Sequence, residues 1–399
     1  MRNTLCITKR AADICKLLLF VIFLTGCGIF VCADNPSISK PFWEGDTVYG
    51  ESLVFIRKGD NPPLSTCLFN PAEIIEIRST FKDIVYTPGK DYKLKPGLRE
   101  IYLPPDSRIQ FIESDSLFPP LGAKDSIKYK ADDKTRGVLF YRLTGFPEIQ
   151  VEITYKHAEK WNGVTPEFVG DKLPGFYGKL KKHDAVRVTI IGDSITSGYN
   201  ASKIVEIPPY QPDWTVLWKD AMMQTFQTPI VCSVKSAPGR TIGWMLLNMD
   251  EQLEIQADLV IIAFGMNDYD AYKSADLFKK KLQEMLLKFL AKNPECEFLL
   301  ISPMLGNPEW SNTPWPLAFS YLEAMKEIEG RVVVADLTSL WFDMLEYKNY
   351  VSLSGNGVNH PNDFGHRIYA QYLLGMFLNN GPVRLDEKAA GMDVPLICK

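Results

Sequence analysis

Ser194 is the residue of this sequence whose position best suits nucleophilic chemistry. It follows an apolar, β-branched run, VRVTIIG at 186–192, within the segment Gly192-Asp193-Ser194. A serine just past a buried strand lies on a tight turn into a helix, with its hydroxyl exposed above the sheet. Such a hydroxyl becomes a nucleophile when a nearby base takes its proton. The competing interpretation is that Asp193 or Ser194 only caps the following helix.

The base that such a serine needs must come from four histidines, which are His157, His183, His360 and His366. His360 precedes Pro361, so it lies in an extended or turn segment before the last helical pattern. An imidazole on that loop can approach the end of the first strand and act as a general base. His366 falls inside the helical pattern, where we expect packing or capping. We expect His157 and His183 to be surface or connector residues.

Two further residues could stabilise the negative charge that forms when Ser194 attacks an acyl carbon. Gly239 lies in the loop KSAPGRTIGW after the second strand-like run, and Asn267 lies in GMND after the third. The backbone N–H groups of Ser194 and Gly239, together with the Asn267 amide, can form an oxyanion hole, in which one donor contributes about 3–4 kcal/mol. The alternatives are a glycine needed for positive φ and an Asx turn.

The elements that must position these residues alternate from about residue 185 onward. Strand-like runs lie at 186–192, 230–235, 259–265, 298–302 and 332–337. Helical patterns lie at 214–226, 277–292, 317–328 and 365–378. Continuous Val/Ile runs that alternate with helices predict a parallel sheet with helices on each side. Ligands bind such sheets at the carboxyl ends of the strands, which is where Ser194, Gly239, Asn267 and His360 are expected.

The region before the α/β domain has a different pattern of apolar and polar residues. Short alternating or β-branched runs broken by Pro, Gly and Asp fill about 40–157, which predicts an antiparallel sandwich or jelly roll. The predicted organisation is a β-rich domain at 34–157, a connector at 158–184, an α/β domain at 185–380 and a tail at 381–399. Asn200-Ala201-Ser202 matches a glycosylation sequon, but a glycan so close to Ser194 would obstruct the site, so we discount it.

Residues 1–33 have the character of an export signal. Basic residues come first, an uncharged apolar run covers 17–33, and Val31-Cys32-Ala33 suits cleavage before Asp34. Leu24-Thr25-Gly26-Cys27 also resembles a lipoprotein box, which would tether the protein to a membrane through Cys27. An uncleaved anchor is the third interpretation. All three place the body outside the cytoplasm, in the periplasm, at the cell surface or in the medium.

The remaining composition excludes several classes of function. The net charge of −4 and the lack of a long basic run argue against nucleic acid as the main partner. Four cysteines lie outside the signal segment, at 67, 232, 296 and 398, and they form no CxxC pair. A zinc or redox site is therefore not expected. A disulfide and buried free thiols both remain open, and the sequence does not give an oligomeric state.

Taken together, these segments resemble the SGNH/GDSL hydrolase family. The four family blocks occur in order, as GDS with Ser194, a glycine block with Gly239, GMND with Asn267 and a histidine block with His360. The match spans about 186–378. The resemblance implies a flavodoxin-like three-layer α/β/α sandwich and an esterase, lipase, thioesterase or carbohydrate deacetylase activity. It also implies that neither a metal nor a cofactor is needed.

One position departs from the family pattern. Members usually carry an aspartate three residues before the histidine, and this sequence has Gly357 there. Three replacements are open: Asp363 as the orienting acid, a backbone carbonyl near Asn356, which would leave a Ser–His dyad, or a distant carboxylate. We favour the dyad. The spacing of Asp363 and His366 mimics the family's usual pair, which we interpret as coincidence.

The combination of an exported β-rich domain and this hydrolase domain resembles some carbohydrate esterases, including the family two acetyl esterases. We therefore expect an exported serine esterase that removes O-acyl groups, most simply O-acetyl groups, from carbohydrate. A lipase or lysophospholipase is the nearest alternative. A catalytically decayed carbohydrate-binding surface protein is the other. Three tryptophans could line a sugar surface or belong to the core: Trp244, Trp310 and Trp315.

Overall fold

The computed structural model describes residues 38–249 and 256–378. All of them belong to one compact unit, Ser37–Lys399. The predicted signal segment with Cys27, and the predicted tail at 381–399 with Cys398, lie outside the described residues. Within the two described stretches, none of the helices is long and apolar enough to cross a bilayer.

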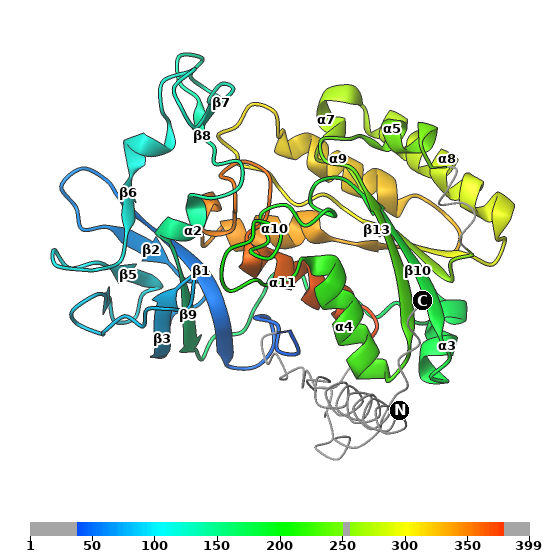
Figure 1. Ribbon diagram of the computed structural model, residues 1–399, viewed down its shortest axis with the longest axis horizontal. Coiled ribbons are helices and arrows are strands. Elements are labelled where there is room, and N and C mark those ends of the chain that lie inside the picture. The colour runs from blue at the N-terminus through cyan, green and yellow to red at the C-terminus, as the bar shows by residue number, and fades with distance from the viewer. Residues whose placement is uncertain (1–37, 250–255, 379–399) are drawn as a thin grey trace, which may run out of the picture. The chain divides into compact units, whose positions relative to one another are not determined.

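A five-stranded parallel sheet forms the centre of the α/β region (Figure 1). Its order is β11-β10-β12-β13-β14. The strands are β10 (Val186–Gly192), β11 (Ile230–Ser236), β12 (Leu259–Ala263), β13 (Glu297–Ile301) and β14 (Val332–Ala335). All five residues of β13 are buried, as are four of the five in β12, as expected of strands that are covered on both faces, and the one charged residue among them, Glu297, accepts from the Gly175 and Phe176 N–H groups. The predicted parallel sheet is confirmed.

The helices of this region form two packed groups. In one, α4 (Trp214–Phe226) lies against α11 (Asp363–Gly375). In the other, α8 (Ala275–Lys292) contacts both α5 (Ile242–Leu247) and α9 (Trp315–Lys326), and α9 contacts α10 (Leu337–Leu345). The remaining helices are α3 (Pro174–Lys181), inside the predicted connector and against β10, and the single turn α7 (Asp268–Ala271). The α/β class is therefore established, and the finer flavodoxin-like three-layer arrangement stays a prediction.

The β-rich region is built around one long strand, β1 (Thr47–Arg57). Its first part pairs with β9 (Gln150–Lys156) and its last residues pair with β2 and β6. The sheet therefore continues through β1 in the order β3-β9-β1-β2-β5-β4, with β6 alongside β1. Its other strands are β2 (Leu64–Thr66), β3 (Glu73–Ser79), β4 (Lys93–Leu94), β5 (Glu100–Tyr102) and β6 (Phe111–Glu113).

A two-stranded ribbon, β7 (Ser126–Ile127) with β8 (Val138–Leu139), and the short helices η1 (Ser114–Leu117) and α2 (Phe146–Ile149) complete this part. Antiparallel pairs predominate, as the short alternating runs predicted. The described strands form this ribbon and one sheet that continues through β1, which pairs with β9 along its first part and with β2 and β6 at its end. The antiparallel β region is therefore present, and its sandwich or jelly-roll arrangement stays a prediction.

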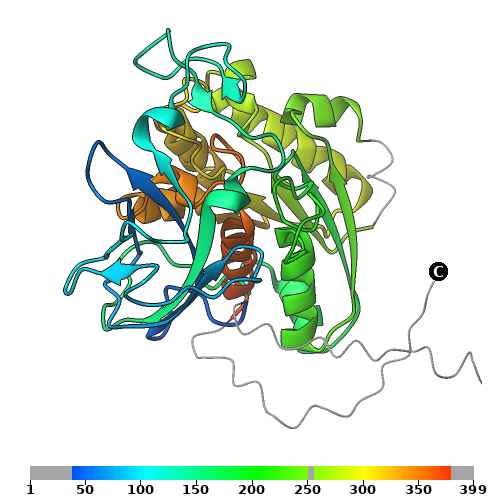
Figure 2. The ribbon, with the colours of Figure 1, turned by 60° about the vertical axis from the view of Figure 1, so that its left-hand side comes forward.

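The β-rich region packs directly on the segment that leads into α11 (Figure 2). Lys348 and Glu51 form an ion pair whose side chains are both fully buried. The backbone N–H of Val54 donates to Ser352 Oγ at 2.9 Å, beside the short helix η2 (Tyr350–Ser352). One hydrophobic cluster runs through both regions.

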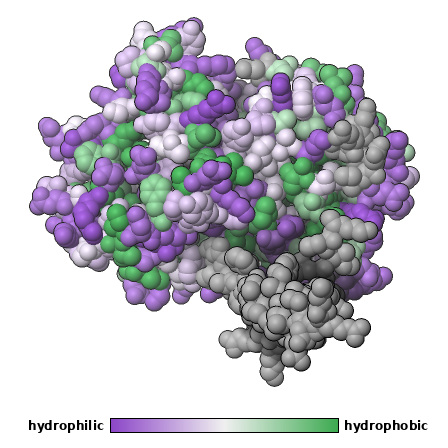
Figure 3. All heavy atoms as spheres, viewed as in Figure 1, coloured by the Kyte–Doolittle hydropathy of each residue, from purple (hydrophilic) through white to green (hydrophobic). Residues whose placement is uncertain are grey.

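The face in Figure 3 is mostly hydrophilic, with hydrophobic residues in separate small groups. The predicted boundaries at 157 and 185 stay predictions.

Candidate active site

Ser194 and His360 meet at the carboxyl edge of the parallel sheet. Ser194 Oγ lies 2.9 Å from His360 Nε2, and the two residues are 4% and 9% exposed. Ser194 follows directly after β10, whose neighbours are β11 on one side and β12 on the other. The chain continues from β10 to β11 on one side of it and then to β12 on the other side, so the strand order reverses at β10. Open α/β sheets bind ligands at such a topological switch point. His360 reaches it from the loop between η2 and α11.

The second ring nitrogen of His360 has a partner that the sequence analysis missed. His360 Nδ1 lies 2.8 Å from Oδ1 of Asn200, a buried residue. Asn200 has φ 66°, a left-handed conformation that asparagine tolerates better than most residues. In the sequence, the only signal of this contact is one asparagine in the turn after Ser194, and it also matches a glycosylation sequon.

The structure corrects the two local candidates for orienting His360. Asp363 Oδ1 accepts a hydrogen bond from the Ser202 backbone N–H at 2.8 Å, so this carboxylate supports the loop after Asn200 and not the imidazole. Burial raises the pKa of Asp363 to about 6. The Asn356 side chain accepts from the His360 backbone N–H at 3.1 Å. The group facing Nδ1 is thus a side-chain amide, and neither Asp363 nor a carbonyl near Asn356 takes that place.

The surroundings of His360 favour its neutral form. Burial, and secondarily the nearby His366, lowers its pKa to about 3. The Tyr199 ring packs edge-on at 5.5 Å, and the Asn200 amide carries no charge. A neutral imidazole with Nε2 toward a serine hydroxyl can accept that proton when the serine attacks.

Asn267 links the serine turn to the glycine loop. Its Nδ2 donates to Asp193 Oδ2 at 3.2 Å and to the Arg240 carbonyl at 3.3 Å. It therefore bonds to the residue before Ser194 and to the residue after Gly239. Gly239 is exposed, with φ +70°, and a Cβ there would meet nothing within 4 Å, so its conformation rather than space calls for glycine. The oxyanion roles of Ser194, Gly239 and Asn267 stay predictions.

Two buried carboxyl groups hold these loops in place. Asp193 Oδ1 accepts from the Ile195 N–H at 2.9 Å, and burial raises the pKa of Asp193 to about 7. Asp268 accepts from the N–H groups of Ile242 and Gly265, and burial raises its pKa to about 7 as well. Each carboxylate satisfies backbone donors that would otherwise be buried without partners.

The remaining candidates fall outside the reacting pair. His366 is buried in α11, with Nε2 3.2 Å from the Tyr199 carbonyl, in agreement with the packing role predicted for it. His183 is exposed. His157 is buried and stacks on Phe69 at 3.9 Å, so its predicted surface position is wrong.

The tryptophans and cysteines also have places in the structure. Trp244, Trp310 and Trp315 are half-buried, and the Trp244 ring lies 5.0 Å from the Arg240 guanidinium. Cys67, Cys232 and Cys296 are free thiols. Among the residues that the structure describes, no three His, Cys, Asp or Glu side chains are grouped so that they could hold a metal ion.

A parallel α/β sheet with a buried Ser–His pair at its switch point defines the class of the serine hydrolases. The comparison with known families narrows this class. Residues 190–368 match the model of the GDSL-like Lipase/Acylhydrolase family. This part of the chain, which is less than half of its length, is thus a GDSL-like lipase/acylhydrolase domain, the domain of a carboxylic ester hydrolase. No curated protein matches the chain.

Solved structures resemble about half of the chain. A two-domain esterase active on acetylated mannans, crystallised with mannopentaose, is 17% identical with a TM-score of 0.42, covering 53% of this chain and 54% of that one. The acetylxylan esterase Axe2 from Geobacillus stearothermophilus is 19% identical with a TM-score of 0.41, covering 50% and 97%. A putative GDSL-like lipase from Parabacteroides merdae is 17% identical with a TM-score of 0.40, covering 48% and 95%.

Proposed function

We propose that this protein is an exported serine esterase that hydrolyses O-acyl esters, most simply O-acetyl esters, on carbohydrate. The observation that carries the proposal is the 2.9 Å contact between Ser194 Oγ and His360 Nε2 within the GDSL-like domain. A hydroxyl and an imidazole at hydrogen-bond distance, both buried, are the minimum apparatus for acyl transfer through a covalent intermediate.

The first half of the reaction forms the acyl-enzyme. Ser194 Oγ bonds to the acyl carbon while its proton moves to His360 Nε2, and the carbonyl π electrons move onto the oxygen. The N–H groups of Ser194 and Gly239 are two proposed donors to that oxyanion, and the Asn267 amide, whose two hydrogens face Asp193 and the Arg240 carbonyl in the free protein, is proposed to turn one of them to it. When the carbonyl reforms, the C–O bond to the sugar breaks, and the sugar oxygen takes the proton from His360. In the second half, water attacks in the same way, and acetate and free Ser194 result.

A polar alcohol is the leaving group that suits the rim of this site. Arg240 lies directly after Gly239, is exposed, and its guanidinium lies over the Trp244 ring at 5.0 Å. The backbone carbonyl of the same arginine accepts from Asn267. A planar cation with several donors, supported on an indole, can hydrogen-bond to hydroxyl groups and offers a flat surface to a sugar ring. These features favour carbohydrate over a long alkyl chain.

The proposal includes export, which rests on the sequence of residues 1–33 alone. A basic start, an apolar run and a small-residue end are the features of a cleaved signal, and the lipoprotein alternative through Cys27 remains within the proposal. An extracellular site would meet acetylated polysaccharides directly.

The test compares the protein with Ser194→Ala and His360→Ala on p-nitrophenyl acetate, p-nitrophenyl butyrate and acetylated xylan and mannan. His183→Ala is the matched control, because His183 is exposed. We expect acetate release from polysaccharide by wild type and by the control, and a loss of about 10⁴-fold or more in both site variants. A preference for butyrate would favour a lipase. No release above Ser194→Ala on any ester would favour a decayed site.

A further inference from the structure

The side chain of Asn200 is held in one orientation by backbone carbonyl groups. Its Nδ2 lies 3.1 Å from the Gly355 oxygen, 3.2 Å from the Leu143 oxygen and 3.4 Å from the Arg142 oxygen. Carbonyl oxygens only accept hydrogen bonds, so the amide nitrogen must face them and Oδ1 must face His360. Because Oδ1 in turn only accepts, His360 Nδ1 must carry the proton, which leaves the Nε2 lone pair for the Ser194 hydroxyl.

Two of these three carbonyls come from the β-rich region. Arg142 and Leu143 lie between β8 and α2, in a segment from Val138 to Phe146 that we call the clamp segment. Its Tyr141 N–H also donates to the Asn356 carbonyl, inside the loop that carries His360, at 3.2 Å. The clamp segment thus contacts both Asn200 and the histidine loop.

The clamp segment also fills the place next to Gly357. This glycine has φ +90°, and a Cβ on it would lie 2.4 Å from the Leu139 carbonyl oxygen and 2.7 Å from the Phe146 ring. Both atoms belong to the clamp segment. Any side chain at this position, an aspartate included, would displace the clamp segment or adopt a strained backbone.

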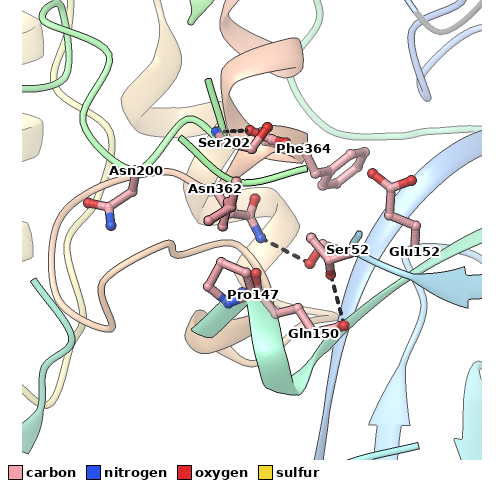
Figure 4. Close-up of a pocket in the computed structure, with 11 residues that line it drawn as sticks. Ser52, Pro147, Gln150, Glu152, Asn200, Ser202, Asn362 and Phe364 are labelled. Carbon is pink, nitrogen blue, oxygen red and sulfur yellow. Dashed lines mark hydrogen bonds between the residues drawn. The ribbon is translucent and has the colours of Figure 1, made fainter. Parts of the chain in front are cut away.

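The histidine loop is fixed from its other side by the β-strands. Gln150 Nε2, at the start of β9, donates to the carbonyls of Val351 at 2.9 Å and Ser354 at 2.8 Å. Asn362 Nδ2 donates to Ser52 Oγ, on β1, at 2.9 Å. Figure 4 shows these side chains around a small pocket between the two regions, with Asn200 at its edge. The β-rich region therefore holds the loop both before and after His360.

We propose that Asn200 is the positioning residue for His360 and that the clamp segment of the β-rich region sets its geometry, so that the β-rich region completes the catalytic site. This inference rests on the proposed function in that Ser194 and His360 are taken as the reacting pair. Asn200 does not touch the reacting acyl carbon. It acts by selecting the tautomer and the ring orientation of the base.

The amide at position 200 differs from a carboxylate in a testable way. An ionised aspartate there would bring negative charge against the three carbonyl oxygens and would have no hydrogen to donate to them. The neutral amide of Asn200 can donate to the three carbonyl oxygens that hold it. It orients the imidazolium that forms during attack, but it adds no negative charge that would stabilise this cation. Its loss should lower kcat and leave KM nearly unchanged, because the substrate does not contact it.

The first experiment reads the tautomer without using activity. The protein, labelled with ¹⁵N in its histidines, is compared by imidazole NMR with Asn200→Gly at neutral pH, and the His360 signals are assigned by their loss in His360→Gln. Glycine is chosen because φ 66° costs it nothing. We expect the Nδ1–H tautomer in wild type and a mixed or Nε2–H signal in Asn200→Gly. An Nε2–H tautomer in wild type, or an unchanged Nδ1–H signal in Asn200→Gly, would overturn the proposal.

The second experiment uses the kinetics of ester hydrolysis. We expect Asn200→Gly to lower kcat by about 10²-fold or more at constant KM, a smaller loss than removal of an orienting carboxylate gives. Phe146→Ala, inside the clamp segment, should lower kcat as well, whereas Phe111→Ala, exposed on β6, should not. Equal kcat values for Phe146→Ala and Phe111→Ala would remove the clamp segment from the proposal.

A third variant restores the usual family acid. Because Gly357 has no room for a side chain, Asn200→Gly/Gly357→Asp should be no more active than Asn200→Gly. Recovery of activity in the double variant would show that an acid fits there and would remove the clamp segment from the proposal. Failure of the proposed function has a different signature, because turnover would then be the same in wild type and Ser194→Ala while the tautomer change in Asn200→Gly would still be seen.

Discussion

The two regions of the molecule contribute to the site in different ways. The α/β region supplies Ser194 and His360, because parallel strands all end at one edge of a sheet and that edge collects whatever follows them. The β-rich region supplies Gln150, Ser52 and the carbonyls of the clamp segment, which hold the loops that carry the reacting groups. The edge of the α/β sheet brings side chains near one another. The β-rich region then holds them within hydrogen-bond distance of their partners.

The contact between the two regions includes buried charged groups as well as the shared hydrophobic cluster. Glu51 pairs with Lys348, and Arg367, on α11, donates to Glu152 and to Gln211. Charges removed from water gain stability only when every partner is in place, so such a surface accepts one relative position of the regions. Variants that disrupt one region at a time therefore test whether the α/β region supplies the side chains of the site and the β-rich region positions them.

The largest effect is expected from breaking the buried ion pair between the regions. Lys348→Met leaves the Glu51 carboxylate buried without its cation, and its other partners are the Leu68 N–H and the Tyr155 hydroxyl. We expect the free energy of unfolding to fall by about 3–5 kcal/mol, measured by denaturant titration.

The control for this experiment is Lys281→Met, which breaks an ion pair with Glu284 on the surface of α8 and should cost about 0–1 kcal/mol. The double variant Glu51→Gln/Lys348→Met should recover part of the loss, since no unpaired charge remains. If Lys348→Met were as stable as the control, the buried contact between the regions would contribute nothing to folding.

The second-largest effect is expected in the α/β region, where one substitution should lower kcat with little change in the free energy of unfolding. Asn267→Ala removes the proposed oxyanion donor, and we expect kcat to fall by about 10²–10³-fold with a small change in stability. Asn248→Ala, at the exposed end of α5, is the matched control and should leave kcat unchanged. A kcat equal to that of wild type in steady-state assays would remove Asn267 from the oxyanion hole.

A smaller effect is expected in the β-rich region at Gln150. Gln150→Ala leaves the Val351 and Ser354 carbonyls without their donor, which should lower stability by about 1–3 kcal/mol and reduce kcat together with it. Asn293→Ala removes an amide-to-carbonyl bond of 2.9 Å to Ala257, far along the chain from the site. It should lower stability similarly at constant kcat. Equal kcat values in the two variants would contradict a positioning role for β9.

Local patterns were sufficient to predict most elements of the α/β region. The run at 186–192 is β10 to the residue, and 214–226 is α4, because continuous β-branched residues and an amphipathic period are properties of a few neighbouring positions. The helix α10 was missed. It begins at Leu337 with Asp336 as its N-cap, directly after β14, so the predicted strand at 332–337 included its N-cap and its first residue.

Ser194 and His360, the proposed reacting pair, could be singled out in the sequence for the same local reason, whereas the partner of His360 Nδ1 could not. Ser194 and His360 each follow a recognisable strand end or precede a helix. Asn200 meets His360 across 160 positions, and its anchors at Arg142 and Leu143 lie in another region of the chain. No spacing in the sequence encodes such a contact. Gly357 indicates only that the usual family aspartate is absent, and it does not identify the residue that replaces it.

The smallest effect concerns pH, and it sharpens the contrast between a neutral and a charged orienting group. Burial, and secondarily His366, lowers the pKa of His360 to about 3, and Asn200 adds no negative charge to raise it. We expect kcat/KM to stay nearly constant from pH 7 down to about 5. An imidazole with an ordinary pKa near 6.5 would lose about 25-fold of its neutral form, and of kcat/KM with it, over that interval.

This profile must be separated from the titration of two neighbouring acids and from acid unfolding. Burial raises the pKa values of Asp193 and Asp268 to about 7, so Asp193→Asn is measured in parallel. A histidine whose folded pKa lies below its unfolded value takes up a proton on unfolding, so its contribution to stability is lost as pH falls from about 6.5 toward 3. Initial rates measured at pH values above the acid-unfolding transition avoid this loss. An acid limb near pH 6.5 in both wild type and Asp193→Asn would mean that His360 is protonated as readily as a solvated imidazole, and the neutral base held by Asn200 would then be excluded.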